Sequence, residues 1–134
     1  DDDAGRATWW IGDAWWRAVA DLGLPGPPTS VWRGVMSRAP WSDLVCFAGR
    51  APGELVSDAG KVVGISQRRS RAGALFQCGA ALTWDPRLLL ELLDIPEPDR
   101  DRAATDLATA ASPLGAAGRR LLEEAFLHHL PTGS

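Results

Sequence analysis

Four of the seven tryptophans of this chain fall between residues 9 and 16, where apolar residues recur every three or four positions. That spacing predicts an amphipathic helix from Thr8 to Leu22, which Gly23 and Pro25 would end. An apolar face this wide needs a covering layer of protein. We therefore interpret the tryptophans as core packing and not as a ligand platform. The apolar positions of the predicted helix are Trp9, Trp10, Ile11, Ala14, Trp15, Ala18, Val19 and Leu22.

Composition narrows the classes of function. The chain has 134 residues, enough for a single domain, and 46% of them are apolar, which suits a buried core. The net charge of -3 gives no reason to expect a nucleic-acid partner. No apolar run reaches the roughly 18–20 residues that cross a bilayer, and the acidic start Asp1-Asp2-Asp3 is unlike a secretory signal. We expect a soluble cytoplasmic protein without a membrane or nucleic-acid partner.

The middle of the chain has the composition of short strands separated by glycine and proline. Residues 54–68 are predicted to form a hairpin around the turn signal Asp58-Ala59-Gly60. The predicted strands are Val31–Met36, Asp43–Phe47, Glu54–Val56, Lys61–Arg68 and Ala72–Leu82.

The chain changes character after residue 83, where alanine and leucine recur at helical spacing. Asp85 is predicted to cap a helix that has Pro86 at its first position. Three helices are expected, at Pro86–Leu93, Arg100–Ala110 and Gly115–Leu130. The whole chain is thus predicted to be a single α+β domain. It would comprise a mixed or antiparallel sheet flanked by helices over residues 8–82 and a helical tail over residues 83–134.

A cluster of basic residues without any acidic neighbour lies between residues 61 and 73, in a chain of net negative charge. The cluster comprises Lys61, Arg68, Arg69 and Arg71. Glycines at 60, 64 and 73 allow a backbone to approach a ligand closely. Two interpretations stay open: a binding site for an anion such as a phosphate or carboxylate, and a solvated basic hairpin.

The two cysteines, Cys46 and Cys78, form neither a disulfide framework nor a zinc pattern. Each is most simply a small core residue. A nucleophilic cysteine needs a nearby cation, which Lys61 supplies for Cys46 only if the two segments are adjacent. The chain contains no phosphate-binding loop, nucleophile elbow or zinc-protease motif, and we expect no metal site.

Residues 46–56 and 60–69 resemble the catalytic centre of lipoate-protein ligases and octanoyltransferases, which belong to the biotin/lipoate protein ligase catalytic superfamily. The first stretch reads C-F-A-G-R-A-P-G-E-L-V and the second reads G-K-V-V-G-I-S-Q-R-R. The segments before and after resemble the helix that precedes this centre and the helices that close it. The resemblance is strongest over residues 46–82 and implies part of a ligase-type catalytic domain.

The resemblance also implies roles for residues in transferring an octanoyl or lipoyl group to a lysine of an acceptor protein. Lys61 matches the family lysine that contacts the acyl carbonyl and, in ligases, the acyl-adenylate phosphate. Cys46 matches the cysteine that forms an acyl-thioester in one octanoyltransferase subfamily. The substrate-binding residues that it implies are Gly64, Gln67, Gln77 and Gly79, together with Arg68 and Arg69 on a rim that meets a lipoyl-domain acceptor or an acyl carrier protein.

The resemblance leaves the mechanism open between two routes. A transferase would use an octanoyl thioester and would need neither ATP nor metal, whereas a ligase would use lipoate with ATP and Mg²⁺. Cys46 favours the transferase.

Two departures from the family pattern limit these expectations. The strand after the basic residues has Gln77 and Cys78 where the family often has a histidine, and no arginine- and glycine-rich ligand loop precedes residue 46. We therefore expect the C-terminal portion of a longer catalytic domain. A non-catalytic fragment, or the subunit of a split enzyme that dimerises or binds a partner, is the alternative.

Overall fold

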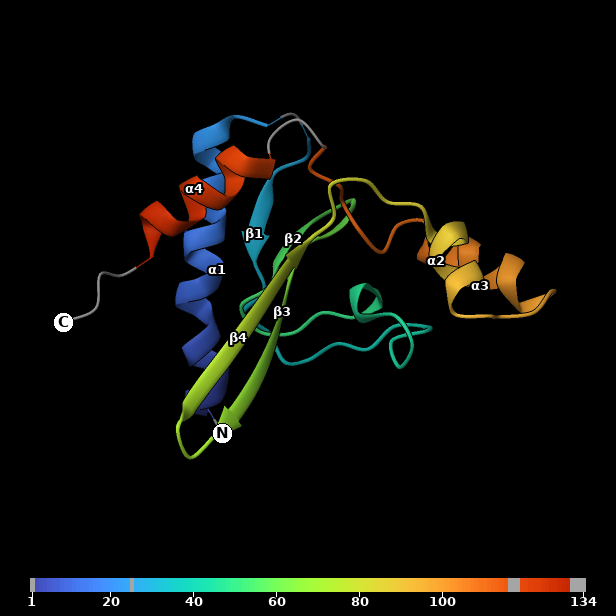
Figure 1. The fold of residues 1–134 in the computed structure, drawn as a ribbon, viewed down its shortest axis with the longest axis horizontal. Coiled ribbons are helices and arrows are strands. Elements are labelled where there is room, and N and C mark those ends of the chain that lie inside the picture. Colours follow the sequence, from blue (N-terminus) through green and yellow to red (C-terminus); the bar gives the residue numbers. More distant parts are fainter. Residues whose placement is uncertain (1, 25, 116–118, 131–134) are drawn as a thin grey trace.

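The computed structural model describes residues 2–24, 26–115 and 119–130 and has an α+β fold (Figure 1). Within these residues, four strands form one antiparallel sheet in the order β1-β2-β3-β4. The α+β class is confirmed, and the sheet is antiparallel rather than mixed. The strands are β1 (Thr29–Val31), β2 (Leu55–Ser57), β3 (Gly60–Ser70) and β4 (Gly73–Ala80). The helices are α1 (Asp2–Leu22), α2 (Pro86–Leu92), α3 (Asp99–Leu107) and α4 (Arg119–His129), with a short 3₁₀ helix η1 (Cys46–Ala48).

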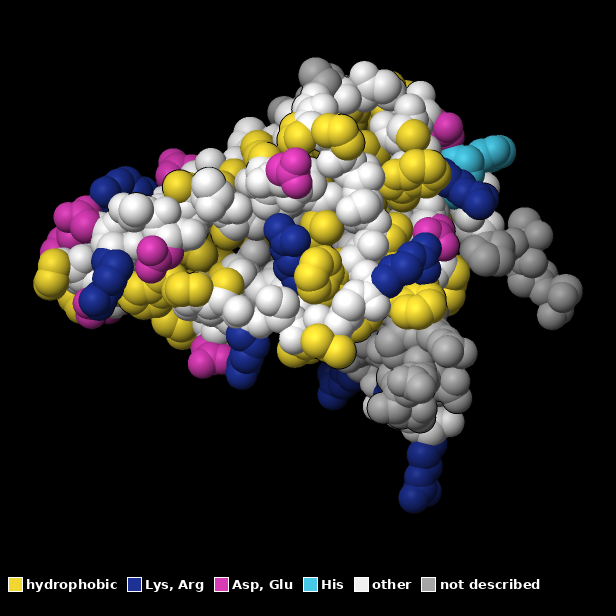
Figure 2. Space-filling model, turned by 180° about the vertical axis from the view of Figure 1, so that it is seen from behind, with side chains coloured by type: hydrophobic (Ala, Val, Ile, Leu, Met, Phe, Trp, Pro, Cys, Tyr) yellow, Lys and Arg dark blue, Asp and Glu magenta, His cyan; other side chains and the backbone are white. Residues whose placement is uncertain are grey.

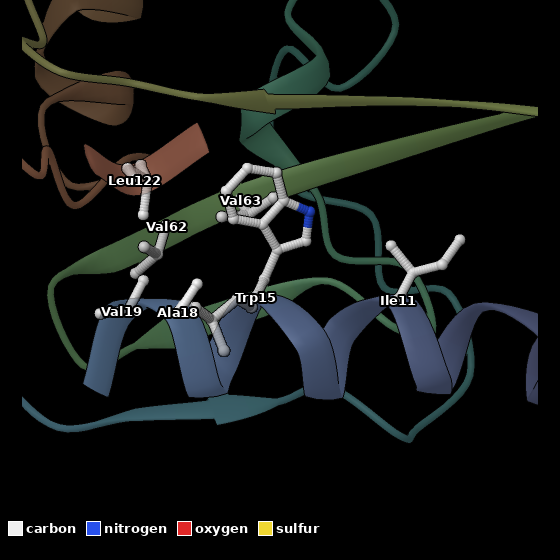
Figure 3. Close-up of a cluster of buried hydrophobic side chains, with 8 residues drawn as sticks. Ile11, Trp15, Ala18, Val19, Val62, Val63 and Leu122 are labelled. Atoms are coloured by element: carbon white, nitrogen blue, oxygen red, sulfur yellow. The ribbon is translucent and has the colours of Figure 1, made fainter. Parts of the chain in front are cut away.

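The predicted N-terminal helix is confirmed, and it begins six residues earlier than its apolar pattern. Helix α1 packs on the sheet, and one stripe of its side chains is buried together with residues of β2, β3 and α4 (Figure 3). Trp15 is at the centre of this cluster and stacks on Phe126 of α4, with 3.9 Å between ring centroids. Trp10 and Trp16, by contrast, remain 43% and 45% exposed. The interpretation as core packing therefore holds for Trp15 but not for every tryptophan.

The hairpin predicted over residues 54–68 is present, and the strand predicted after it forms a second hairpin with β3. Strands β2 and β3 are joined at residues 58–59, and β3 pairs with β4 from Val63 opposite Ala80 to Ser70 opposite Gly73. Strands β2, β3 and β4 each differ from their predicted bounds by no more than two residues at either end. Beyond the rest of the sheet, the β3–β4 hairpin extends toward the N-terminal end of α1 (Figure 1).

Two predicted strands are wrong. The first strand is Thr29–Val31 and not Val31–Met36, because the Trp32 indole donates a hydrogen bond to the Val35 carbonyl and closes a turn. Residues Asp43–Phe47 form turns and η1 rather than a strand. Their apolar pattern reflects packing of Val45 into a second cluster and not pairing in the sheet.

Three helices follow residue 83 in the part of the chain that the structure describes, as predicted. Residues 116–118 of the last predicted helix, and Pro25, lie outside the described residues. The Asp85 carboxylate caps α2 as predicted, accepting from the backbone N–H groups of Arg87 and Leu88. Helices α2 and α3 enclose the second apolar cluster with Val45, Leu90 and Leu107 as members.

The surface of the α2–α3 end carries acidic and basic side chains side by side (Figure 2). An ion pair between Arg87 and Asp101 links α2 to α3 there, with 2.8 Å between Nη2 and Oδ1. Among the described helices, none has both the length and the apolar character needed to cross a membrane.

Candidate functional site

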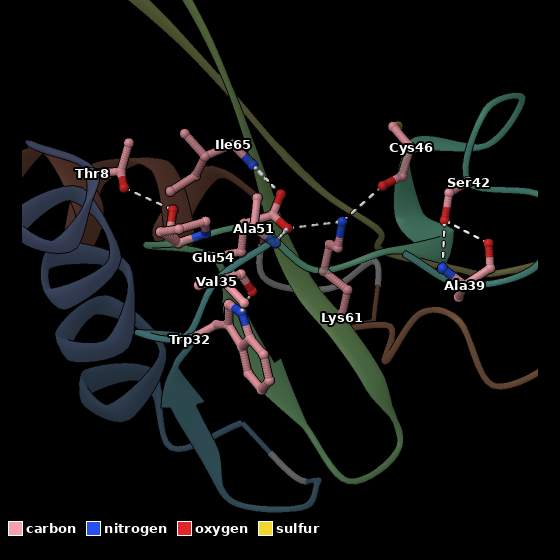
Figure 4. A network of polar contacts seen from close by, with 11 residues as sticks. Thr8, Trp32, Val35, Ala39, Ser42, Cys46, Ala51, Glu54, Lys61 and Ile65 are labelled. Atoms are coloured by element: carbon pink, nitrogen blue, oxygen red, sulfur yellow. Dashed lines mark hydrogen bonds and ion pairs between the residues drawn. The ribbon is translucent and has the colours of Figure 1, made fainter. Parts of the chain in front are cut away.

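A buried ion pair lies at the base of the β3–β4 hairpin. The Lys61 ammonium is 2.9 Å from the Glu54 Oε1 atom, and both side chains are about 95% buried, with 4% and 5% of their surface exposed (Figure 4). The same ammonium donates to the backbone carbonyl of Cys46 at 2.7 Å. Lys61 therefore joins three chain segments: β3, the turn before β2, and η1.

The Glu54 carboxylate has further partners. Its Oε1 atom accepts from the backbone N–H of Ala51 and its Oε2 atom accepts from that of Ile65, each at 2.8 Å. Buried charges are tolerated only when paired and hydrogen-bonded. Since two N–H groups and one ammonium surround Glu54, this condition is met for a carboxylate.

A β-bulge decides which face of the sheet carries Lys61. Leu55 pairs with Val63 while Val56 pairs with Lys61, so Val62 has no partner on β2. Val62 and Val63 both enter the core with α1, and Lys61 points to the opposite face. Because of the extra residue, Lys61 and Gly64 lie on the same face although three positions separate them.

Gly64 leaves the space that the ion pair occupies. A Cβ atom at this position would be 3.3 Å from the Glu54 Oε2 atom and 3.5 Å from the Lys61 Cδ atom. The first of these contacts is tighter than ordinary van der Waals packing. The glycine thus permits close approach of the carboxylate to the β3 backbone, where Ile65 donates to it.

Helix α1 holds the turn that carries Glu54. The Thr8 hydroxyl donates to the Pro52 carbonyl at 2.7 Å, and Gly12 packs against Gly53 so closely that a Cβ on either glycine would meet backbone or side-chain atoms within 2.6 Å. Gly53 itself has a φ of 89°, a conformation that favours glycine. The position of Glu54 is consequently fixed by contacts with the helix.

Cys46 begins η1 and is exposed, beside the buried pair. The ring of Phe47, the next residue, lies 5.4 Å from the Lys61 ammonium and 5.7 Å from the Trp84 ring. A cavity of about 250 Å³ opens between η1 and the hairpin. It is lined by Cys46, Phe47, Glu54, Gly64, Ile65, Ser66, Gln77, Cys78 and Gly79.

The structure brings several of the predicted site residues together. Cys46, Gly64, Gln77 and Gly79 line this cavity, and Lys61 lines a neighbouring one of about 190 Å³ that also contains Cys46 and Glu54. The sequence left open whether the segments of Cys46 and Lys61 are adjacent, and in the structure the two residues are in contact. The contact joins the Lys61 ammonium to the backbone carbonyl of Cys46 in a 3₁₀ helix, so the two residues do not lie on adjacent strands.

Three predicted residues lie elsewhere. Gln67 is opposite Phe76, on the face that α4 covers, and Arg69 follows two positions later on that same face. Arg68 is exposed further along the hairpin, where it lines a separate surface hollow with Leu75. The structure therefore does not place Gln67, Arg68 or Arg69 at the cavity beside Cys46.

Sequence reasoning missed Glu54. One signal was available: the glutamate directly follows Gly53 and begins a predicted strand of apolar residues, so it was unlike a solvated acidic side chain. No local pattern connects it with Lys61, because the pairing depends on the bulge and on the path of η1.

Cys78 is exposed on the edge strand β4, but part of its thiol surface is covered. This desolvation raises the pKa of the Cys78 thiol above its ordinary value, and a side-chain hydrogen bond with Trp15 has a smaller, opposite effect. Because the thiolate is the reactive form, we expect the rate of Cys78 alkylation by iodoacetamide to be still rising at pH 9.0 in a Cys46→Ser variant. A rate that levels off below pH 8, measured by mass spectrometry, would contradict this.

Comparisons with protein-family models, with curated proteins and with solved structures found no match to this chain. Within the residues described by the structure, no group of three or more histidine, cysteine or acidic side chains is arranged to hold a metal ion. The candidate site must therefore be interpreted from its own chemistry.

That chemistry is a fixed ammonium hydrogen-bonded to the backbone carbonyl of an exposed cysteine. A lysine ammonium has three N–H donors, and two of them here point to Glu54 and to the Cys46 carbonyl. Its charge is balanced by the carboxylate, so the pair is neutral as a whole. Such an arrangement can orient one further oxygen acceptor beside Cys46 without adding a net buried charge.

Proposed function

We propose that this chain provides the cysteine and lysine of a site that transfers an octanoyl or lipoyl group to a lysine of an acceptor protein. The observation that carries the proposal is the hydrogen bond between the Lys61 ammonium and the Cys46 carbonyl, which holds the exposed cysteine beside a buried cation. The resemblance of residues 46–82 to octanoyltransferases and lipoate-protein ligases supports the same two residues.

The transferase route consists of two exchanges at one acyl carbon. The Cys46 thiolate attacks an octanoyl thioester, a new carbon–sulfur bond forms, and the donor thiol leaves and takes up a proton. The amine of the acceptor lysine then attacks, an amide bond forms, and Cys46 leaves as a thiol with a proton from that amine. Lys61 would donate to the acyl oxygen when negative charge develops on it.

The cavity beside Cys46 fits an acyl group in polarity. Its walls include Phe47 and the glycines Gly64 on β3 and Gly79 on β4. Gln77 provides an amide at the same cavity, where it can contact the polar end of the acyl group.

The acceptor would be a lipoyl domain and the donor an acyl carrier protein. In a ligase route, lipoate, ATP and Mg²⁺ would replace the thioester, and Lys61 would contact the adenylate phosphate.

A mass-spectrometric experiment tests the transferase route. Incubation with an octanoyl-carrier protein is expected to add one octanoyl group to Cys46, which hydroxylamine should release as it does other thioesters. The Cys46→Ser variant should not form this thioester, whereas Cys78→Ser, which retains the candidate nucleophile, should form it. An absent adduct together with ATP-dependent pyrophosphate release would exclude the transferase route and favour the ligase route.

A second candidate function follows from the neutrality of the ion pair. If Lys61 serves only to connect β3, η1 and Glu54, the chain is a non-catalytic partner subunit. In that case, neither an acyl adduct nor pyrophosphate release would be detected with any donor, while the folded protein would still bind its partner.

A further inference from the structure

The outer edge of β4 has no neighbouring strand in the part of the chain that the structure describes, because the sheet order ends there. An open edge exposes backbone N–H and C=O groups that can pair with another strand. Proteins usually protect such edges with charged residues, proline or a bulge. Strand β4 reads G-A-L-F-Q-C-G-A, without charge or proline, and it pairs with β3 over eight consecutive residues without a bulge.

The hairpin geometry shows which residues are free to pair outward. Ser70 and Gly73 close a two-residue loop, so they form the first hydrogen-bonded pair of the ladder. Hydrogen-bonded pairs then recur at every second residue. The residues of β4 that direct their backbone groups away from β3 are therefore Ala74, Phe76, Cys78 and Ala80.

We propose that β4 pairs antiparallel with β4 of a second copy of this chain, about a two-fold axis at Cys78. In this register, large side chains lie opposite small ones. Phe76 is opposite Ala80 of the second copy on the face toward α1 and α4, and Gln77 is opposite Gly79 on the other face. Such pairs avoid crowding between the strands. A register centred one residue earlier would put Phe76 opposite Cys78 and lose this complementarity.

The apolar surface beside the edge supports the same arrangement. A cavity of about 670 Å³ lies between β4, α1 and α4, and its helix side is lined by Trp15, Leu122, Phe126 and Leu127 together with Arg119 and Glu123. Leu127 is 64% exposed. Edge pairing about a two-fold axis puts the helices of both copies on one side of a continuous sheet. The second copy would therefore cover this cavity with its own helix layer.

Charge is also complementary at the ends of the proposed pairing. The loop end of each hairpin carries Arg71, in a stretch without acidic residues from 59 to 84. The same register directs this end toward the segment after β4 of the second copy, where Asp85 follows. Neither copy of β4 contributes a charge to the middle of the interface.

Light scattering after gel filtration tests the proposal with the 134-residue chain. We expect a dimer and no larger species, because a two-fold interface is closed. Cys78→Pro removes an outward N–H that the symmetry uses twice, and Cys78→Val is the matched control because valine retains this donor. The proline variant should dissociate about tenfold or more readily, with circular dichroism showing that both variants are folded. A monomeric parent chain, or an equally stable proline dimer, would overturn the proposal.

Disulfide cross-linking gives a second measurement that needs no folded proline variant. In a Cys46→Ser background, Cys78 is the only thiol and would face its own copy with Cα atoms about 5.5 Å apart, within reach of a disulfide. Diamide at pH 9.0 should oxidise the two thiols to one disulfide, with two electrons and two protons passing to the diamide. Absence of the cross-linked dimer at concentrations where light scattering shows dimers would exclude this register. The proposal of a dimer does not rest on the proposed acyl transfer.

Discussion

Gly12→Ala is expected to destabilise the protein by about 2–3 kcal/mol, although alanine is the better helix former. Helix propensity alone would stabilise α1 by about 1 kcal/mol. The added Cβ, however, would lie 2.2 Å from the Gly53 carbonyl oxygen and 2.8 Å from the Val31 Cγ1 atom. The first atom belongs to the backbone and cannot move without shifting the turn before β2. The steric clash therefore outweighs the gain in helix propensity, and the net change in the free energy of unfolding is a loss of stability.

Urea unfolding measures this effect, with Gly79→Ala as the control. A Cβ at Gly79 would meet no heavy atom within 4 Å, so its free energy of unfolding should change by less than about 0.5 kcal/mol. Unchanged or increased stability of Gly12→Ala would show that α1 does not approach Gly53 as closely as the structure has it.

The same substitution should also disturb the candidate site. Gly53 immediately precedes Glu54, whose Oε1 atom is held by the Ala51 N–H of the same turn. A displaced turn would lengthen the contact between Glu54 and Lys61, although Gly12 is on the other side of the turn from the cavity. We therefore expect Gly12→Ala to lower any activity of the site along with stability.

Local sequence patterns predicted the elements whose structure is decided locally. The β3–β4 hairpin alternates over enough residues to be recognised, and Asp85 followed by Pro86 indicates the start of α2. The apolar spacing of α1 could be identified because Trp15, Ala18 and Val19 pack on one surface. These features depend on neighbours within a few positions in the sequence.

The parts that could not be predicted depend on distant contacts. Val45 and Phe47 have the composition of a strand, yet Val45 packs with Leu90 and Leu107, which are more than 40 residues away in the sequence. Nothing in the stretch Lys61-Val62-Val63 indicates that Val62 is an extra residue, and the bulge decides the face on which Lys61 lies. Gln67 was also predicted to lie at the site, but alternation along β3 after the bulge puts it on the opposite face of the sheet, opposite Phe76.

Lys61→Met is expected to destabilise the protein by about 3–5 kcal/mol, the usual effect of removing one partner from a buried ion pair. Methionine fills a similar volume, so the substitution leaves no large cavity. The loss of stability would therefore come from the Glu54 carboxylate, which stays buried without its cation. Arg38→Met provides the control because Arg38 pairs with Asp43 at the surface, where their side chains are 70% and 82% exposed. Pairs of this kind contribute little to stability. Urea unfolding of both variants at neutral pH would make the comparison.

A double variant separates the structural role of Lys61 from a role in chemistry. Lys61→Met combined with Glu54→Gln leaves no buried charge, and the glutamine oxygen can still accept from one of the two backbone N–H groups that hold Glu54. The double variant should therefore be more stable than Lys61→Met alone, with a coupling free energy of about 1–3 kcal/mol in a double-mutant cycle. Purely additive losses would mean that the two side chains do not form the ion pair.

If the chain transfers acyl groups, the stabilised double variant then decides whether Lys61 takes part in that reaction. If Lys61 donates to the acyl oxygen, the double variant should transfer acyl groups about 10²-fold more slowly or worse. The variant is folded, but it lacks the ammonium that donates to the acyl oxygen. If the ion pair only connects β3, η1 and the turn before β2, restored folding should restore the wild-type rate. Comparing the activity of this variant with its unfolding free energy thus assigns Lys61 to the reaction or to the framework of the site.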